Sequence, residues 1–171
     1  MQKLATLLAF TAVLAAGASA QGTFKIDRPV RAELGLYIPT FSGSDNDLGV
    51  AVGAGYAFYR YKNVEFAGVA RGQFYHASDN GFGGDFSLTS VGVDARYRPV
   101  GEKYFVGLGL LGAHLDVDTD FGSAATTKLG YSLEAGYDFT EKLYGVVRFQ
   151  DTTQSNLDVY RGVTVGVGYR F

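Results

Sequence analysis

The 171-residue chain has no cysteine, no tryptophan and only three prolines. Without cysteine there are no disulfides, so an exported chain needs another source of stability, which a closed barrel with paired backbone groups supplies. A formal net charge of −2, from 15 basic and 17 acidic residues, provides no basic field for nucleic acid. After the first twenty residues, no apolar run is long enough for a membrane-spanning helix. Membrane insertion would therefore require a closed β-sheet.

The first twenty residues have the organisation of a secretory signal peptide. Lys3 gives a positive start, residues 4–16 are apolar, and residues 18–20 (Ala-Ser-Ala) form a cleavage site. The apolar run is too short for a transmembrane anchor, which needs about 20 apolar residues. We expect residues 1–20 to be a signal peptide, residues 21–29 a short leader, and residues 30–171 a single barrel domain.

The rest of the chain is rich in glycine, tyrosine and phenylalanine, with 24, 12 and 13 residues, which favours strands and turns. Apolar residues alternate with small or polar ones in eight stretches. These stretches lie at 30–38, 48–59, 64–75, 90–98, 104–111, 128–139, 143–150 and 162–171. Loops are expected at 41–47, 77–85, 116–125 and 152–158, and tight turns between them. Strands of about ten residues fit a bilayer, so the pattern predicts an all-β, eight-stranded antiparallel up-and-down transmembrane β-barrel.

The composition of the two strand faces indicates which one points inward. A soluble lipocalin-like barrel would alternate in the same way, with its apolar face inside. Here the other face carries many glycines, such as Gly53, Gly107 and Gly136, which suit a crowded interior. Charges of both signs lie among them, as a closed interior requires if each charge is to find a partner. The predicted interior charge network is Arg31, Glu33, Glu65, Arg71, Asp94, Arg96, Glu134, Asp138, Arg148 and Arg170.

Aromatic residues on the apolar face gather close to the tight turns. They are Tyr56, Phe58, Phe66, Tyr97, Tyr104, Tyr137, Phe139, Tyr169 and Phe171. Such a cluster is typical of the aromatic girdle at one interface of a membrane barrel. The apolar face is therefore expected to contact lipid.

The last strand ends on an aromatic residue. Val165, Val167, Tyr169 and Phe171 share one face, and this pattern resembles the C-terminal signature of bacterial outer-membrane β-barrels. Residues 30–171 resemble the small eight-stranded class that includes the OmpA transmembrane domain, OmpX and OmpW. The resemblance implies a monomer in the outer membrane of a Gram-negative-type bacterium, without a cofactor. Its implied partners are outer-membrane lipid, lipopolysaccharide and the barrel-assembly machinery.

The expected function is a non-enzymatic structural or loop-mediated interaction role in the cell envelope. Three alternatives remain open: a lipid A-modifying hydrolase, a channel for small hydrophobic compounds, and a soluble lipocalin-like carrier. The hydrolase alternative rests on His76 and Ser78, which are similar to the catalytic pair of outer-membrane lipid A deacylases. Asp85 is expected to face the same, lipid-facing side of the sheet as this pair. The pair lies earlier in the chain than in that family, and Asp79 replaces the asparagine that follows there.

Three alternating aspartates near residue 118 mimic the start of a calcium-binding EF-hand loop. They are Asp116, Asp118 and Asp120. Phe121 replaces the required glycine, and Thr127 replaces the bidentate glutamate. No metal site is therefore expected, and the sequence has no phosphate-binding loop or cofactor motif.

Overall fold

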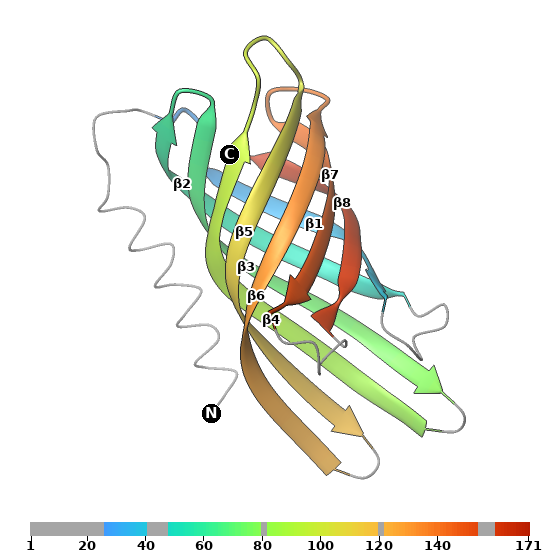
Figure 1. Cartoon of the computed structure of the whole chain (residues 1–171). Helices are drawn as coiled ribbons and strands as arrows, with labels where there is room; N and C mark the ends of the chain where they lie inside the picture. The colour runs from blue at the N-terminus through green and yellow to red at the C-terminus, as the bar shows by residue number, and fades with distance from the viewer. Residues whose placement is uncertain (1–25, 41–47, 80–81, 120–121, 154–159) are drawn as a thin grey trace.

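A computed structural model describes residues 26–40, 48–79, 82–119, 122–153 and 160–171, which form one closed antiparallel barrel (Figure 1). Its strands are β1 (Val30–Pro39), β2 (Gly49–Tyr61), β3 (Val64–Asp79), β4 (Phe82–Tyr97), β5 (Tyr104–Thr119), β6 (Gly122–Asp138), β7 (Leu143–Thr152) and β8 (Gly162–Arg170). Neighbours in sequence pair with each other, and β1 closes the ring on β8. The predicted eight-stranded up-and-down barrel is confirmed.

Parts of the predicted domain organisation lie outside the described residues. These are the signal peptide at 1–20, most of the leader, and the loops at 41–47 and 154–158. Within the described residues, no helix combines the length and the apolar character needed to cross a membrane.

The strands present an apolar face outward and a polar, glycine-rich face inward. On β8, Val165 is 46% exposed whereas Thr164 is 4% exposed. On β6, Leu133 is 47% exposed whereas Ser132 is 1% exposed. Side chains of a strand alternate between its two faces, so this contrast extends around the ring. The outward face is the one predicted to contact lipid.

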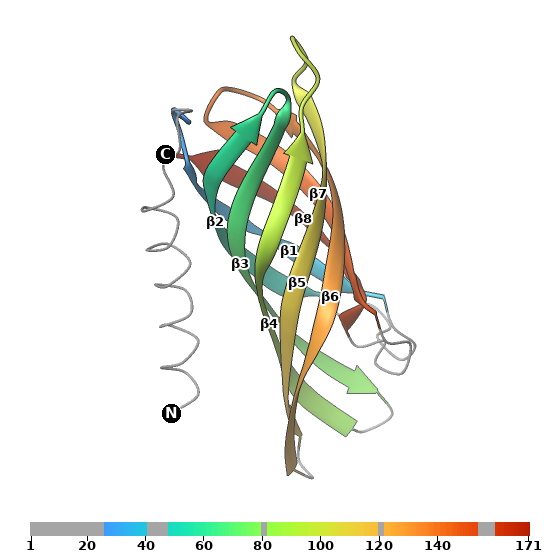
Figure 2. The ribbon, with the colours of Figure 1, turned by 60° about the vertical axis from the view of Figure 1, so that its left-hand side comes forward.

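Four strands continue well past the others at the end opposite the tight turns. The β3–β4 and β5–β6 hairpins extend beyond β1, β2, β7 and β8 (Figures 1 and 2). Residues 75–79, 82–89, 114–119 and 122–129 form this projecting sheet, in which β4 also pairs with β5. The loops expected at 77–85 and 116–125 are therefore wrong over most of their length. Their polar composition reflects exposure to water beyond the barrel wall, and alternating residues still pair across strands.

A β-bulge reverses the expected facing at the end of β2. The register shifts between Ala57 and Tyr59, so that Tyr59 pairs with Phe66. A bulge inserts one extra residue into a strand and changes which side chains point outward beyond it. Strict alternation over residues 48–59 would place Tyr59 on the inner face with Gly53, but its side chain is 45% exposed, and its ring centroid lies 5.9 Å from that of Phe66.

Interior glycines leave room for large aromatic rings from neighbouring strands. A Cβ added to Gly168 would collide with the ring of Tyr144, and one added to Gly136 would collide with the ring of Phe105. Tyr144 is 0% exposed and Phe105 is 1% exposed, so neither ring has space to move away. The glycine-rich inner face thus serves to pack a filled interior.

Candidate functional site

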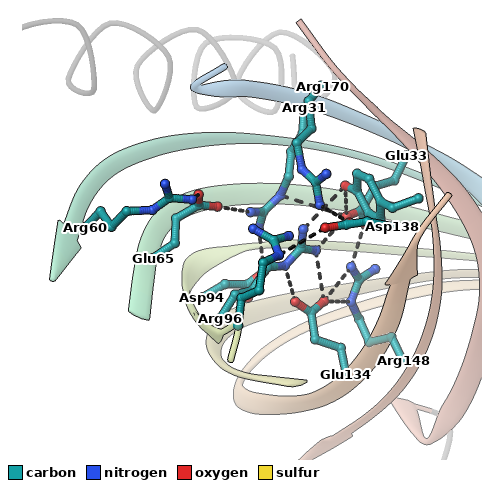
Figure 3. A network of polar contacts seen from close by, with 12 residues as sticks. Arg31, Glu33, Arg60, Glu65, Asp94, Arg96, Glu134, Asp138, Arg148 and Arg170 are labelled. Atoms are coloured by element: carbon teal, nitrogen blue, oxygen red, sulfur yellow. Dashed lines mark hydrogen bonds and ion pairs between the residues drawn. The ribbon is translucent and has the colours of Figure 1, made fainter. Parts of the chain in front are cut away.

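A network of buried ion pairs occupies the middle of the barrel, and Glu134 on β6 is one of its centres (Figure 3). Its carboxylate accepts hydrogen bonds from the Arg96 guanidinium, one of them 3.1 Å long from Nη2 to Oε2. Arg148 donates two more, at 3.0 Å from Nε and 2.8 Å from Nη2. The side chain of Glu134 is 1% exposed, so protein groups replace the water that would otherwise solvate its charge.

Two further carboxylates complete the same network. Glu33 accepts hydrogen bonds from Arg96 at 2.7 Å, Arg148 at 2.5 Å and the Tyr144 hydroxyl at 2.7 Å. Asp94 accepts one from Arg31 at 2.9 Å and another from Arg71. These side chains come from strands all around the ring, so the network ties opposite walls of the barrel together.

Of the ten charged residues predicted for the interior, eight belong to this one network, including Glu65, whose Oε1 lies 3.4 Å from Arg31 Nη1. Asp138 and Arg170 form a second group nearer the tight turns, where Arg170 Nη2 donates to Asp138 Oδ1 at 2.7 Å. Sequence reasoning did not assign Arg98 and Arg60, which pair with Asp138 and Glu65. Burial lowers the pKa of Arg98, an effect that Asp138 opposes.

The neutral members of the interior were also missed, because nothing in their sequence distinguishes them from other inward residues. Gln73 donates to Gln150 at 3.1 Å, and both side chains are buried. A cavity of about 10 Å³ beside Gln73, Thr164 and Arg148 has room for about one water molecule. Gln73 Oε1 and Thr164 Oγ1, from two of the residues that line this cavity, have no hydrogen-bond partner among the described residues.

An apolar and aromatic layer covers the polar interior at its outer end. This layer consists of Tyr37, Tyr75, Phe86, Leu88, Leu115 and Tyr160. The rings of Tyr75 and Phe86 stack with centroids 4.9 Å apart. Tyr160 donates to the Thr126 carbonyl at 3.0 Å, and burial raises the pKa of its hydroxyl. The lumen is therefore filled by ion pairs, amides and rings in succession, which leaves no room for a wide pore.

The outer face of the projecting sheet carries the polar residues that the sequence singled out. His76 Nδ1 lies 2.8 Å from Asp85 Oδ1, and the two residues are directly opposite on β3 and β4. Asp85 is in turn opposite Asp118 on β5. Ser78 pairs with Gly83 through its backbone, but its side chain is outside the described part of the structure.

The three aspartates that resemble the start of an EF-hand loop do not lie in a calcium-binding loop. Asp116 and Asp118 are strand residues, opposite Ala125 and Ser123, whereas Asp120 and Phe121 lie outside the described residues. His114, on the same face, contacts Thr127 Oγ1 at 2.8 Å. Among the residues that the structure describes, no three His, Cys, Asp or Glu side chains are grouped to hold a metal ion.

Solved structures with the same fold come from several bacterial outer-membrane proteins. Ail, the attachment invasion locus protein of Yersinia pestis, is 17% identical, with a TM-score of 0.56 over 85% of this chain and 100% of that chain. The N-terminal β-barrel domain of Pseudomonas aeruginosa OprF is 18% identical, with a TM-score of 0.54 over 84% and 98%. Neisserial surface protein A is 20% identical, with a TM-score of 0.53 over 83% and 96%. At these identities the likeness establishes the fold alone.

A comparison with curated proteins found no match. The family model of the outer membrane protein β-barrel domain, however, matches residues 5–171, nearly the whole chain. This match agrees with the closed ring of eight strands and the exposed apolar face described above. The chain belongs to the outer membrane protein β-barrel family, and it is a protein of the outer membrane.

Proposed function

We propose that this protein is a non-enzymatic outer-membrane protein that makes contacts outside the cell through its projecting sheet, while the filled barrel serves as an anchor. The main support for this proposal is the unequal length of the strands. β3 to β6 extend past the barrel wall, whereas the lumen is occupied by ion pairs and rings. A filled interior argues against the channel alternative, and an apolar outward face argues against the soluble carrier.

The charge of the projecting sheet bears on the class of its partner. One solved structure shows Ail of Yersinia pestis in complex with the heparin analogue sucrose octasulfate. In this chain, the outer face of the projecting sheet instead carries Asp85, Asp116 and Asp118, which would repel a sulfated polyanion. We therefore propose a neutral or basic partner. A monomeric state, contact with lipopolysaccharide and insertion by the barrel-assembly machinery remain parts of the proposal.

Shortening the two long hairpins tests this function. In one variant, residues 77–84 and 117–124 are each replaced by a two-residue turn, which leaves the barrel wall intact. We expect normal outer-membrane amounts and a normal mobility shift on heating in detergent, but no rescue of the envelope or attachment phenotype of a deletion strain. Full rescue by this variant would assign the role to the barrel and overturn the proposal.

A lipid A-modifying hydrolase is a second candidate, because His76 and Asp85 are held at 2.8 Å as a base and its orienting carboxylate would be. If this candidate is correct, a His76→Ala variant should lose a deacylated lipid A species that the parent produces. Mass spectra of lipid A from parent, variant and deletion strains provide the measurement. Identical spectra in all three strains are what our non-enzymatic proposal requires.

A further inference from the structure

The arginines and carboxylates on the inner face of the barrel do not balance at the end beside the tight turns. The network in the middle of the barrel joins four arginines to four carboxylates: Arg31, Arg71, Arg96, Arg148, Glu33, Glu65, Asp94 and Glu134. The opening beside the tight turns, which we call the turn-side mouth, adds three arginines and one carboxylate: Arg60, Arg98, Arg170 and Asp138. Arg60 contacts only Glu65, which Arg31 already shares. Three guanidiniums against one carboxylate leave two positive charges unmatched at this mouth.

Arg98 is the arginine of the turn-side mouth with the fewest partners. It directly follows β4, and its Nε lies 3.0 Å from Asp138 Oδ2. This contact lacks hydrogen-bond geometry, so the buried Nε has no acceptor among the described residues. Burial lowers the pKa of Arg98, Asp138 opposes that effect, and Arg170 and Arg60 lower the pKa further. An anion bound here would accept the unused hydrogen bonds and relieve the repulsion between the cations.

Arg98 and Arg170 converge on one place in the turn-side mouth. Arg170 Nη2 donates to Asp138 Oδ1 at 2.7 Å (Figure 3), so both guanidiniums contact the same carboxylate. Arg98 Cζ lies 5.5 Å from the centre of the Phe105 ring, and Arg170 Cζ lies 4.3 Å from that of Tyr144. Both rings are fully buried, whereas the two arginine side chains are 27% and 13% exposed. The guanidiniums therefore lie between these rings and the water outside the mouth.

The size of the charge excess bears on the kind of anion. The planar fork of an arginine binds two oxygens of a phosphate or a carboxylate at once. A phosphate monoester carries about 1.5–2 negative charges at pH 7, close to the excess of two at the mouth. A carboxylate or a phosphate diester carries only one negative charge and would leave one guanidinium unmatched.

We propose that Arg98 and Arg170, with Arg60 beside them, form a binding site for a phosphate monoester at the turn-side mouth. Short turns of outer-membrane barrels face the periplasm, so the ligand reaches the site from that side. A soluble phosphate monoester and the headgroup of phosphatidic acid present the same chemistry to these arginines. The site lies at the opposite end of the barrel from the projecting sheet, so the proposal goes beyond the proposed function and does not depend on it.

The test uses the full chain in maltoside micelles, which contain no phosphate, and titrates it with glycerol 3-phosphate by calorimetry. We expect one saturable site that binds glycerol 3-phosphate roughly tenfold or more tightly than dimethyl phosphate, which has a single charge. Arg98→Gln should weaken binding by about tenfold or more, and Arg98→Lys should restore only part of the loss, because lysine lacks the planar fork. Lys103→Gln is the matched control, since it removes an exposed cation from the same turn and should leave binding unchanged.

The mobility shift on heating in detergent checks that each variant is folded. A second variant, Arg60→Gln, changes a side chain that is 45% exposed, and it should weaken binding severalfold through the loss of one charge. Equal affinity of the parent and Arg98→Gln for glycerol 3-phosphate would overturn the proposal. Equal affinity of the parent for glycerol 3-phosphate and dimethyl phosphate, or an equal loss in Lys103→Gln, would reduce the effect to general charge attraction and also overturn it.

Nanodiscs of phosphatidylcholine that contain a second lipid identify the source of the phosphate. If phosphatidic acid, a lipid monoester, blocks glycerol 3-phosphate binding and phosphatidylglycerol, a diester, does not, the site is confirmed and takes a lipid headgroup. If binding persists with both lipids, the site is confirmed and takes a soluble compound. If both lipids block binding equally, any anionic surface is sufficient, and the proposal is wrong.

Discussion

Replacing Glu134 by alanine is expected to lower the free energy of unfolding by about 3–5 kcal/mol. The substitution removes the carboxylate shared by Arg96 and Arg148 and leaves both guanidiniums buried with excess positive charge. Arg148 is 3% exposed and Arg96 is 3% exposed, so water cannot easily take the place of the lost partner. Removing one member of a buried pair costs more than the pair contributes, because the remaining charge stays desolvated.

This loss is measured by unfolding the protein in urea in the presence of lipid vesicles. Tyrosine fluorescence follows the unfolding, because the chain has no tryptophan. Glu141→Ala is the matched control, because Glu141 also pairs with an arginine, Arg28 at 3.0 Å, but its side chain is 82% exposed. An exposed pair of this kind contributes about 0–1 kcal/mol. If both variants unfold at the same urea concentration as the parent, Glu134 is solvated and the interior is not closed to water.

Single cysteines on the closing strand should react in opposite ways with lipid-soluble and water-soluble probes. The chain has no native cysteine, so Val165→Cys and Thr164→Cys each create one labelling site. A fluorophore at position 165 should be quenched by brominated lipid, since Val165 is 46% exposed on the apolar face. Position 164 should label far more slowly from water, because Thr164 is 4% exposed inside a filled barrel.

Leu133→Cys and Ser132→Cys on β6 repeat the comparison on another strand. Leu133 is 47% exposed and Ser132 is 1% exposed, so the same contrast is expected there. A slip of one residue in the register of β8 would exchange the faces of that strand alone. Fast aqueous labelling at both 164 and 132, with protection at 165 and 133, would show that the apolar face points inward.

The number of strands and the direction of their faces could be predicted because both depend on a two-residue period. That period is visible wherever one side contacts lipid, as with Val165 and Val167 on β8. It failed at Tyr59, because a bulge adds one residue and nothing in the local sequence marks its position. The structure beyond Tyr75 was also predicted wrongly. The polar residues there suggest a loop, but they belong to paired strands exposed to water.

The individual partners of the interior charges could not be predicted. Glu33 and Arg148 are far apart in sequence, yet their side chains meet at 2.5 Å on the inner face, on the two strands that flank β8. Which inward rows meet depends on the stagger of the strands around the ring, a property of the whole barrel. The alternation of residues along a strand shows which side chains face inward. It does not identify the neutral side chains, such as Tyr144 and Gln150, that complete the interior hydrogen bonds.

The pairing of β1 with β8 has a consequence for the order in which this chain folds. Arg31 lies opposite Arg170, so the first and last strands of the domain become neighbours only when the whole chain is present. The long hairpins between β3 and β6 close through local contacts, which form sooner than contacts between distant segments. Glu33 on β1 meets Arg148 on β7 only in the assembled ring. Closure of the ring is therefore expected to be a late step, and it completes the charge network by bringing Glu33 to Arg148.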